Sequence, residues 1–247
     1  MQTRELHALI SVVREASASG FYSARWGAAA DLDSIPTVSR EDLRATPLSK
    51  RRYKREKGLV KVIHDERGAF LSEWSFADIG REEYGVYAKR PMVYLSDPHE
   101  AIEKSMWCYE RGMLPLVGEK DAAITSYAAG RYQIDSLITD AESLAKLTSY
   151  LEGRTEPLDS ISLIGASFDP HSLMPYRAYA ARIRLVLSLP ETGAFAAAEL
   201  AAKPVFEALP GCTIEKEQTL IVSKDRMLVT PIIRYRTDIP THVYDGA

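Results

Sequence analysis

A strand, a helix and a second strand follow one another between residues 160 and 187 of the chain. Residues 160–164 have the apolar character of a buried strand, 165–170 contain turn residues, 171–182 indicate a helix, and 183–187 form a second apolar run. Parallel strands need a crossover connection of this kind, whereas antiparallel strands can be joined by a tight turn. The sequence therefore predicts that 160–164 and 183–187 are parallel neighbours in one sheet.

The remaining patterns predict helices on either side of this unit and hairpins toward both ends. Helices are expected over 3–17, 40–44, 97–113 and 140–152, where apolar residues recur at helical spacing or a capping residue opens the segment. Hairpins are expected over 58–71 and 218–235. The predicted fold class is α/β, with a mixed, largely parallel sheet flanked by helices and a hairpin-rich C-terminal part. We expect one lobe over 1–247, with a weak subdivision near 118–121.

Composition is typical of a soluble globular protein. The 247 residues include 31 Lys and Arg against 34 Asp and Glu, and 46% are hydrophobic, which excludes a disordered or fibrous chain. Two cysteines, Cys108 and Cys212, are too few for a disulfide framework, and no apolar run approaches the roughly 20 residues of a spanning helix. We expect a cytoplasmic protein without a membrane or nucleic-acid partner, and leave a homo-oligomer open.

One segment departs from this acidic balance. Residues 40–61 hold nine basic and three acidic residues, densest over 50–57. Clustered cations attract polyanions, so a phosphate or nucleic-acid contact is one interpretation. A solvated basic face is the other interpretation, and we favour it because a single basic patch on an acidic protein is not typical of nucleic-acid binders.

Familiar catalytic motifs are missing from the sequence. It has no GxxxxGK[ST] or GxGxxG loop and no HExxH, GxSxG or EF-hand pattern. The glycines at Gly80 and Gly85 have phosphate-loop spacing, but Val86 and Tyr87 stand where lysine and a hydroxyl are needed. The five histidines show no metal-ligand spacing. None of these common motifs therefore identifies a catalytic or metal site in this sequence.

Four stretches, in order along the chain, resemble the acyl-adenylate-forming (AMP-binding) superfamily, in its phenylacetate–CoA ligase-like form. Residues 35–44 (IPTVSREDLR) resemble that family's P-x-x-T-K-x-D-L-R segment, and 163–170 (LIGASFDP) resemble its G-A-E-P turn. Residues 188–193 (SLPETG) are similar to Y-G-x-[ST]-E, and 230–238 (TPIIRYRTD) to P-L-I-R-Y-R-T-G-D. The resemblance covers roughly 30–240, and the last stretch is the most specific.

The resemblance implies ATP-dependent activation of a small carboxylic acid to an acyl-adenylate, which can pass to CoA, an amine or a carrier protein. ATP and Mg²⁺ are the implied cofactors. Glu191 would hold the magnesium ion and act in catalysis with Thr192. The implied nucleotide contacts are Gly165, Ala166, Ser167, Arg236 and Asp238.

Physical chemistry is compatible with these roles and with simpler ones. A glutamate beyond a strand's C-terminal end can bind magnesium through oxygen, and an aspartate can accept from ribose hydroxyls. Glu191 could instead be a helix-start carboxylate, and Asp238 a turn residue before Pro240. On the first interpretation, Glu191, Thr192 and Asp238 line one nucleotide cleft at the C-terminal end of 183–187.

The sequence also departs from the family pattern. The phosphate loop is not recognisable, the glycine before Asp238 is missing, and Ser188 and Leu189 replace the aromatic and glycine before Glu191. The family's lysine-bearing C-terminal domain has no counterpart, so we expect a reduced form, with the lysine supplied by another chain if it is active. Three hypotheses stay open: an acyl-adenylate-forming ligase, a degenerate subunit that binds nucleotide or acyl-adenylate, and a structural partner in a biosynthetic complex.

Overall fold

Two compact units make up the computed structural model of this chain, which describes residues 3–26, 34–52, 58–65, 68–86, 88–225 and 229–245. The first unit comprises Met1–Arg81, Pro190–Phe195 and Ala208–Thr241, and the second comprises Glu82–Leu189, Ala196–Glu207 and His242–Ala247. The subdivision expected near 118–121 falls inside the second unit. No helix among the described residues is long and apolar enough to cross a membrane.

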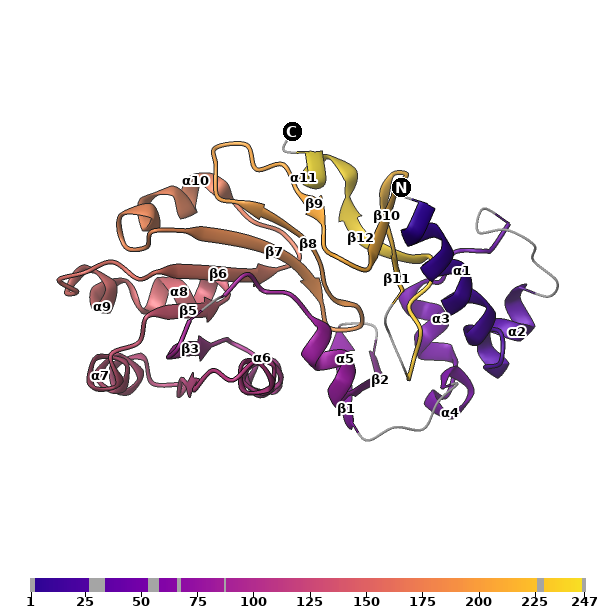
Figure 1. Cartoon of the computed structure of the whole chain (residues 1–247), viewed down its shortest axis with the longest axis horizontal. Helices are drawn as coiled ribbons and strands as arrows, with labels where there is room; N and C mark the ends of the chain where they lie inside the picture. Colours follow the sequence, from indigo (N-terminus) through magenta and orange to yellow (C-terminus); the bar gives the residue numbers. More distant parts are fainter. Residues whose placement is uncertain are drawn as a thin grey trace. The chain divides into compact units, whose positions relative to one another are not determined.

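The second unit is built on a mostly parallel sheet (Figure 1). The whole sheet has the strand order β4-β3-β5-β6-β7-β8-β9, with parallel pairing from β4 through β7. Its strands are β3 (Pro91–Tyr94), β4 (Leu116–Val117), β5 (Ser136–Thr139), β6 (Ser160–Gly165), β7 (Ile183–Leu189), β8 (Gly193–Glu199) and β9 (Glu207–Ala208). β6 and β7 pair with Leu163 opposite Leu185, which confirms the predicted parallel neighbours.

Helices connect these strands and cover the sheet. They are α6 (Pro98–Glu110), α7 (Ala122–Tyr132), α8 (Ala141–Lys146), α9 (Thr148–Glu152) and α10 (Pro170–Leu173). α11 (Thr241–Asp245) also lies mostly in this unit but joins no two strands of the sheet. α6 begins where predicted, because the Asp97 carboxylate accepts a hydrogen bond from the backbone N–H of His99 at 2.8 Å. The predicted α/β class, with helices flanking a mixed and largely parallel sheet, is confirmed.

Two predicted helices are shorter than expected. The helix expected over 171–182 is the four-residue α10 followed by the 3₁₀ helix η1 (Met174–Ala178). Pro175 explains this, since it has no N–H for an α-helical hydrogen bond and its ring clashes with the preceding turn. The helix expected over 140–152 divides at Leu147 into α8 and α9, where the Thr148 hydroxyl donates to the carbonyl of Ala145.

Small antiparallel sheets and short helices form the first unit. Its elements are α1 (Thr3–Ala16), α2 (Gly20–Trp26), α3 (Arg40–Ala45), α4 (Leu48–Arg51), β1 (Gly58–Asp65), β2 (Gly68–Ser75), α5 (Phe76–Arg81), β10 (Cys212–Lys216), β11 (Thr219–Lys224) and β12 (Tyr235–Pro240). β1 and β2 form the predicted hairpin, and β10, β11 and β12 form a three-stranded antiparallel sheet, which confirms a hairpin-rich C-terminal part. The second strand expected over 227–235 instead begins at Tyr235, and 226–228 lie outside the described residues.

Part of the basic segment supports this unit from within. Arg51 is 2% exposed, and its guanidinium donates to the backbone carbonyls of Thr46 and Leu71. Arg52 forms an ion pair with Glu73 at 2.8 Å. These contacts give Arg51 and Arg52 structural roles, which neither of the two interpretations of the segment anticipated. Residues 53–57, the rest of its dense part, lie outside the described residues.

Candidate functional site

The turn between β7 and β8 carries Glu191 into a buried cluster of the first unit. Glu191 is 1% exposed, and its Oε1 accepts hydrogen bonds from Arg40 Nε at 2.7 Å and from the Tyr235 hydroxyl. Arg40 Nη2 lies 2.6 Å from the same oxygen. A carboxylate, a guanidinium and a phenol from three distant parts of the sequence therefore meet at one atom. We call these three residues the Glu191 cluster.

Backbone pairing places Val38, two residues before Arg40, opposite Tyr235. The Val38 N–H donates to the carbonyl of Arg234 at 2.9 Å, and the Arg236 N–H donates to the carbonyl of Val38 at 2.8 Å. Ser39 then caps α3 in a capping box with Asp42, so Arg40 is the first residue of that helix. The segments 35–44 and 230–238, quoted separately for the family resemblance, thus lie directly against each other.

The Glu191 carboxylate shifts the pKa values of both its partners. Burial lowers the pKa of Arg40, but the adjacent Glu191 carboxylate raises it more, and the net shift is upward. Burial and the same carboxylate raise the pKa of Tyr235, so its phenol stays protonated at neutral pH and donates its hydrogen bond. The cluster is therefore an ion pair to which a neutral phenol adds a hydrogen bond. A ligand would meet a paired carboxylate here and not an isolated one.

A magnesium ion does not fit Glu191 in this arrangement. Magnesium requires an octahedral oxygen shell and usually keeps several waters. Oε1 already accepts from Arg40 and Tyr235, while Oε2 is buried and has no hydrogen-bond partner among the described residues. Within the described part of the chain, no group of three or more His, Cys, Asp or Glu could hold a metal. The one carboxylate oxygen without a partner is enclosed beside a guanidinium, which is an unfavourable setting for a hydrated dication.

The other predicted residues of this unit are divided between two faces. Thr192 is fully buried, and its hydroxyl donates to the carbonyl of Gly193 at 3.0 Å. Along β12, Tyr235, Thr237 and Ile239 are buried, whereas Asp238 is exposed and Arg236 is half-buried in an ion pair with Glu217 at 2.7 Å. Glu191 contacts the buried Tyr235 of β12, whereas Asp238 on the same strand is exposed. The two carboxylates therefore differ in their access to solvent.

Gly165, Ala166 and Ser167 lie in the second unit, at the C-terminal end of β6. Ala166 and Ser167 are exposed. The next residue, Phe168, lines a pocket of about 310 Å³. The rings of Phe168 and Phe206 are stacked, with centroids 6.2 Å apart. The pocket's polar side chains are those of His171, Lys203 and His242. A planar ring and an anionic group would both find complementary partners here.

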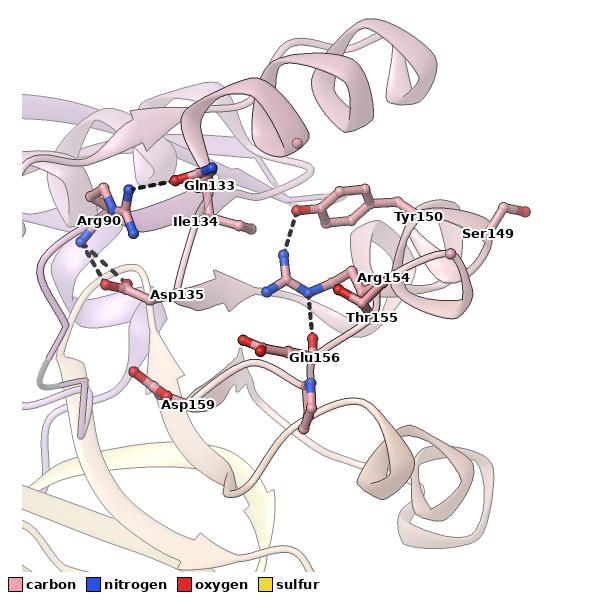
Figure 2. Close-up of a pocket in the computed structure, with 13 residues that line it drawn as sticks. Arg90, Gln133, Ile134, Asp135, Ser149, Tyr150, Arg154, Thr155, Glu156 and Asp159 are labelled. Atoms are coloured by element: carbon pink, nitrogen blue, oxygen red, sulfur yellow. Dashed lines mark hydrogen bonds between the residues drawn. The ribbon is translucent and has the colours of Figure 1, made fainter.

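A larger pocket, of about 680 Å³, opens near the N-terminal ends of β5 and β6 (Figure 2). Arg154 projects into it, with Nη1 donating to the Tyr150 hydroxyl at 2.8 Å and Nε to the carbonyl of Glu156 at 3.0 Å. Arg90 and Asp135 close its opposite side, and the Asp135 carboxylate accepts from the Arg90 N–H. This pocket adjoins the N-terminal end of β5, whereas open α/β sheets bind ligands beyond the C-terminal ends.

Sequence reasoning missed the partners of Glu191 and the aromatic pocket. Arg40 and Tyr235 lie inside two quoted motifs, but no spacing rule relates residues 151 and 44 positions away from Glu191. Phe168 directly follows the predicted turn 165–167 and could have been included with it. Phe206, Lys203 and His242 carry no local signal, because only the fold brings them beside Phe168.

Comparison with known proteins gives a structural likeness and no sequence match. No protein-family model matches the chain, and no curated protein matches it. Among solved structures, O-succinylbenzoate Coenzyme A synthetase (MenE) from Bacillus subtilis in complex with AMP is 12% identical, with a TM-score of 0.55 over 70% of this chain and 42% of that chain. Coronafacic acid ligase from Pectobacterium brasiliense is 13% identical, with a TM-score of 0.51 over 68% and 39%.

A third structure, VinN with L-aspartate, is 12% identical, with a TM-score of 0.54 over 67% of this chain and 49% of that chain. This chain therefore spans less than half the length of each of the three structures. At such identities the likeness concerns the fold.

Proposed function

We propose that this chain, which has the fold of the acyl-adenylate-forming (AMP-binding) enzymes, binds a nucleotide and a small carboxylic acid and uses ATP to form an acyl-adenylate. The observation that carries the proposal is the meeting of 35–44, the 190–192 turn and 230–238 around the Glu191 cluster. Three of the four stretches that resemble the family are joined there by hydrogen bonds, as parts of one working site would be. CoA, an amine or a carrier protein is the proposed acceptor, and a separate lysine-bearing domain is a proposed partner.

Each residue has a role in this proposal that follows from its exposure. Exposed Asp238 is proposed to accept hydrogen bonds from the ribose hydroxyls, and Arg236 to contact the nucleotide's phosphate. Gly165, Ala166 and Ser167 lie in the other unit, and their contact with a nucleotide stays a prediction from the sequence. Glu191 and Thr192 are buried, so we assign them positioning roles: they fix the turn against α3 and β12.

The pocket at Phe168 supports a ligand that combines a ring with an anionic group. Stacked aromatic rings favour a planar group, and Lys203 with the two histidines favours a carboxylate or phosphate. Its volume is near the lower end of small-molecule sites. These features suit a small acid or one part of a nucleotide.

Pyrophosphate exchange into ATP, measured with a panel of small carboxylic acids, tests the reaction. We expect acid-dependent exchange and AMP binding by calorimetry, and Asp238→Ala should raise the AMP dissociation constant about tenfold or more because one charged hydrogen bond is lost. Asp159→Ala, an exposed aspartate of the second unit, is the matched control and should change neither quantity. If neither pyrophosphate exchange nor nucleotide binding is detected, the proposal is wrong.

A second candidate is a subunit that binds nucleotide or acyl-adenylate without turnover. The specific observation in its favour is that Arg40 and Tyr235 already engage the glutamate that the resemblance assigned to magnesium. Nucleotide binding without exchange, for every acid tested, would favour this candidate over the enzyme.

A further inference from the structure

The Glu191 cluster carries an inference about how the chain balances charge at its proposed site. We propose that the guanidinium of Arg40 takes the place of a divalent cation at Glu191, so that an anionic ligand meets a fixed side-chain cation and binds without magnesium. The ligand part of this inference rests on the proposed function. The ion pair itself is an independent property of the chain.

The contacts explain why Arg40 excludes a metal ion. Two guanidinium nitrogens lie 2.7 and 2.6 Å from Glu191 Oε1, and the Tyr235 hydroxyl donates to the same oxygen. A dication would have to displace these donors and lie beside a permanent positive charge. The single negative charge of Glu191 is already matched by one positive charge, which leaves little electrostatic attraction for a second cation.

Arg40 is also placed to meet a ligand. Its side chain is 23% exposed, whereas that of Glu191 is 1% exposed, so the cationic partner lies on the solvent side of the pair. Its backbone is fixed by the Ser39 cap and by the pairing of Val38 with β12. A second arginine braces the same segment, since Arg234 donates to the Ile35 carbonyl and pairs with Glu215 at 2.8 Å. The positive charge is therefore preorganised.

Direct metal binding is the first test, and it needs no nucleotide. The probe is Mn²⁺ alone, with the free ion measured by electron paramagnetic resonance in the presence of wild type, Glu191→Gln or the control Glu142→Gln, an exposed carboxylate on α8. We expect the same Mn²⁺ titration curve for all three proteins at millimolar concentrations. A site present in wild type and in Glu142→Gln but lost in Glu191→Gln would overturn the proposal.

A double-mutant cycle is the second test, and it measures the pair by thermal unfolding in EDTA. Arg40→Met should lower Tm by at least about 6 °C, because it leaves a buried carboxylate without its cation. Arg40→Met combined with Glu191→Gln should recover a large part of that loss. The exposed pair Lys146 and Glu142 is the control, and Lys146→Met should shift Tm by less than about 3 °C. If the Tm shifts of Arg40→Met and Glu191→Gln are additive in the double variant, the two side chains do not interact and the proposal is wrong.

AMP binding in EDTA and in magnesium separates this inference from the proposed function. Equal affinity in the two buffers supports metal-independent binding, and a requirement for magnesium that Glu191→Gln abolishes contradicts it. If AMP binds in neither buffer, the proposed function fails, while the Mn²⁺ titration and the double-mutant cycle still decide whether Arg40 replaces the cation.

Discussion

Single residues in the first unit show how paired charges shape the site. Asp42 completes the capping box of α3, the helix that presents Arg40: its carboxylate accepts from the Ser39 N–H at 2.8 Å, from the Ser39 hydroxyl at 3.0 Å and from Arg25. Burial raises the pKa of Asp42, but the hydrogen bonds from Ser39 and Arg25 outweigh it and the net shift is downward. The folded state therefore favours the ionised form of the Asp42 carboxylate.

Linkage then fixes how this residue contributes to stability as pH changes. A depressed folded pKa gives stability that is present above the unfolded value near 3.9 and is lost as pH falls through the folded pKa. Asp42→Asn should therefore cost roughly 0.5 kcal/mol of unfolding free energy at pH 7, because solvent screens this partly exposed group, and progressively less below about pH 4. Urea unfolding followed by circular dichroism at pH 7 and pH 3 measures this. An equal cost at both pH values would contradict the assignment.

At the scale of elements, close packing in the second unit restricts which glycines can change. An ideal Cβ at Gly118, just after β4, would lie 2.4 Å from Cδ2 of the buried Tyr94 ring and 3.1 Å from Cγ2 of Thr125. Gly130 lies within α7, and its nearest atom would be 4.0 Å away, on Tyr150. The first position has no room for a methyl group and the second does.

These two glycines form a matched pair of substitutions with opposite signs. Gly118→Ala should lower the unfolding free energy by about 1–3 kcal/mol through overpacking. Gly130→Ala should raise it by about 0.5–1 kcal/mol, because alanine loses less backbone entropy in a helix. Chemical denaturation of both variants beside wild type checks the signs. Two shifts in the same direction would show that the packing around β4 or α7 differs from this description.

Elements with strong local signals were predictable from the sequence, and contacts between distant elements were not. Local chemistry predicts three of these features: the helix cap at Asp97, the apolar strands β6 and β7, and the turn at Gly68. The helix predicted over 171–182 is shorter in the structure because Pro175 interrupts it. The Glu191 cluster could not be predicted, since its burial depends on how Val38 pairs with β12, which no residue spacing encodes.

At the scale of the whole molecule, the chain combines a known fold with a buried ion pair between Arg40 and Glu191. The chain shares its fold with proteins of which the matched part covers less than half, and the glutamate that the family resemblance assigned to magnesium is instead bound by Arg40. The central claim is that the chain still binds an adenylate-type ligand, with a guanidinium serving as the local cation.

Isothermal titration with a non-hydrolysable acyl-sulfamoyl adenosine, in one buffer with EDTA and one with magnesium, tests that claim most directly. The predicted result is saturable binding of one ligand per chain, with dissociation constants that agree within about twofold between the two buffers, where tenfold corresponds to about 1.4 kcal/mol. Absence of heat in both buffers, or binding only with magnesium, would contradict the account.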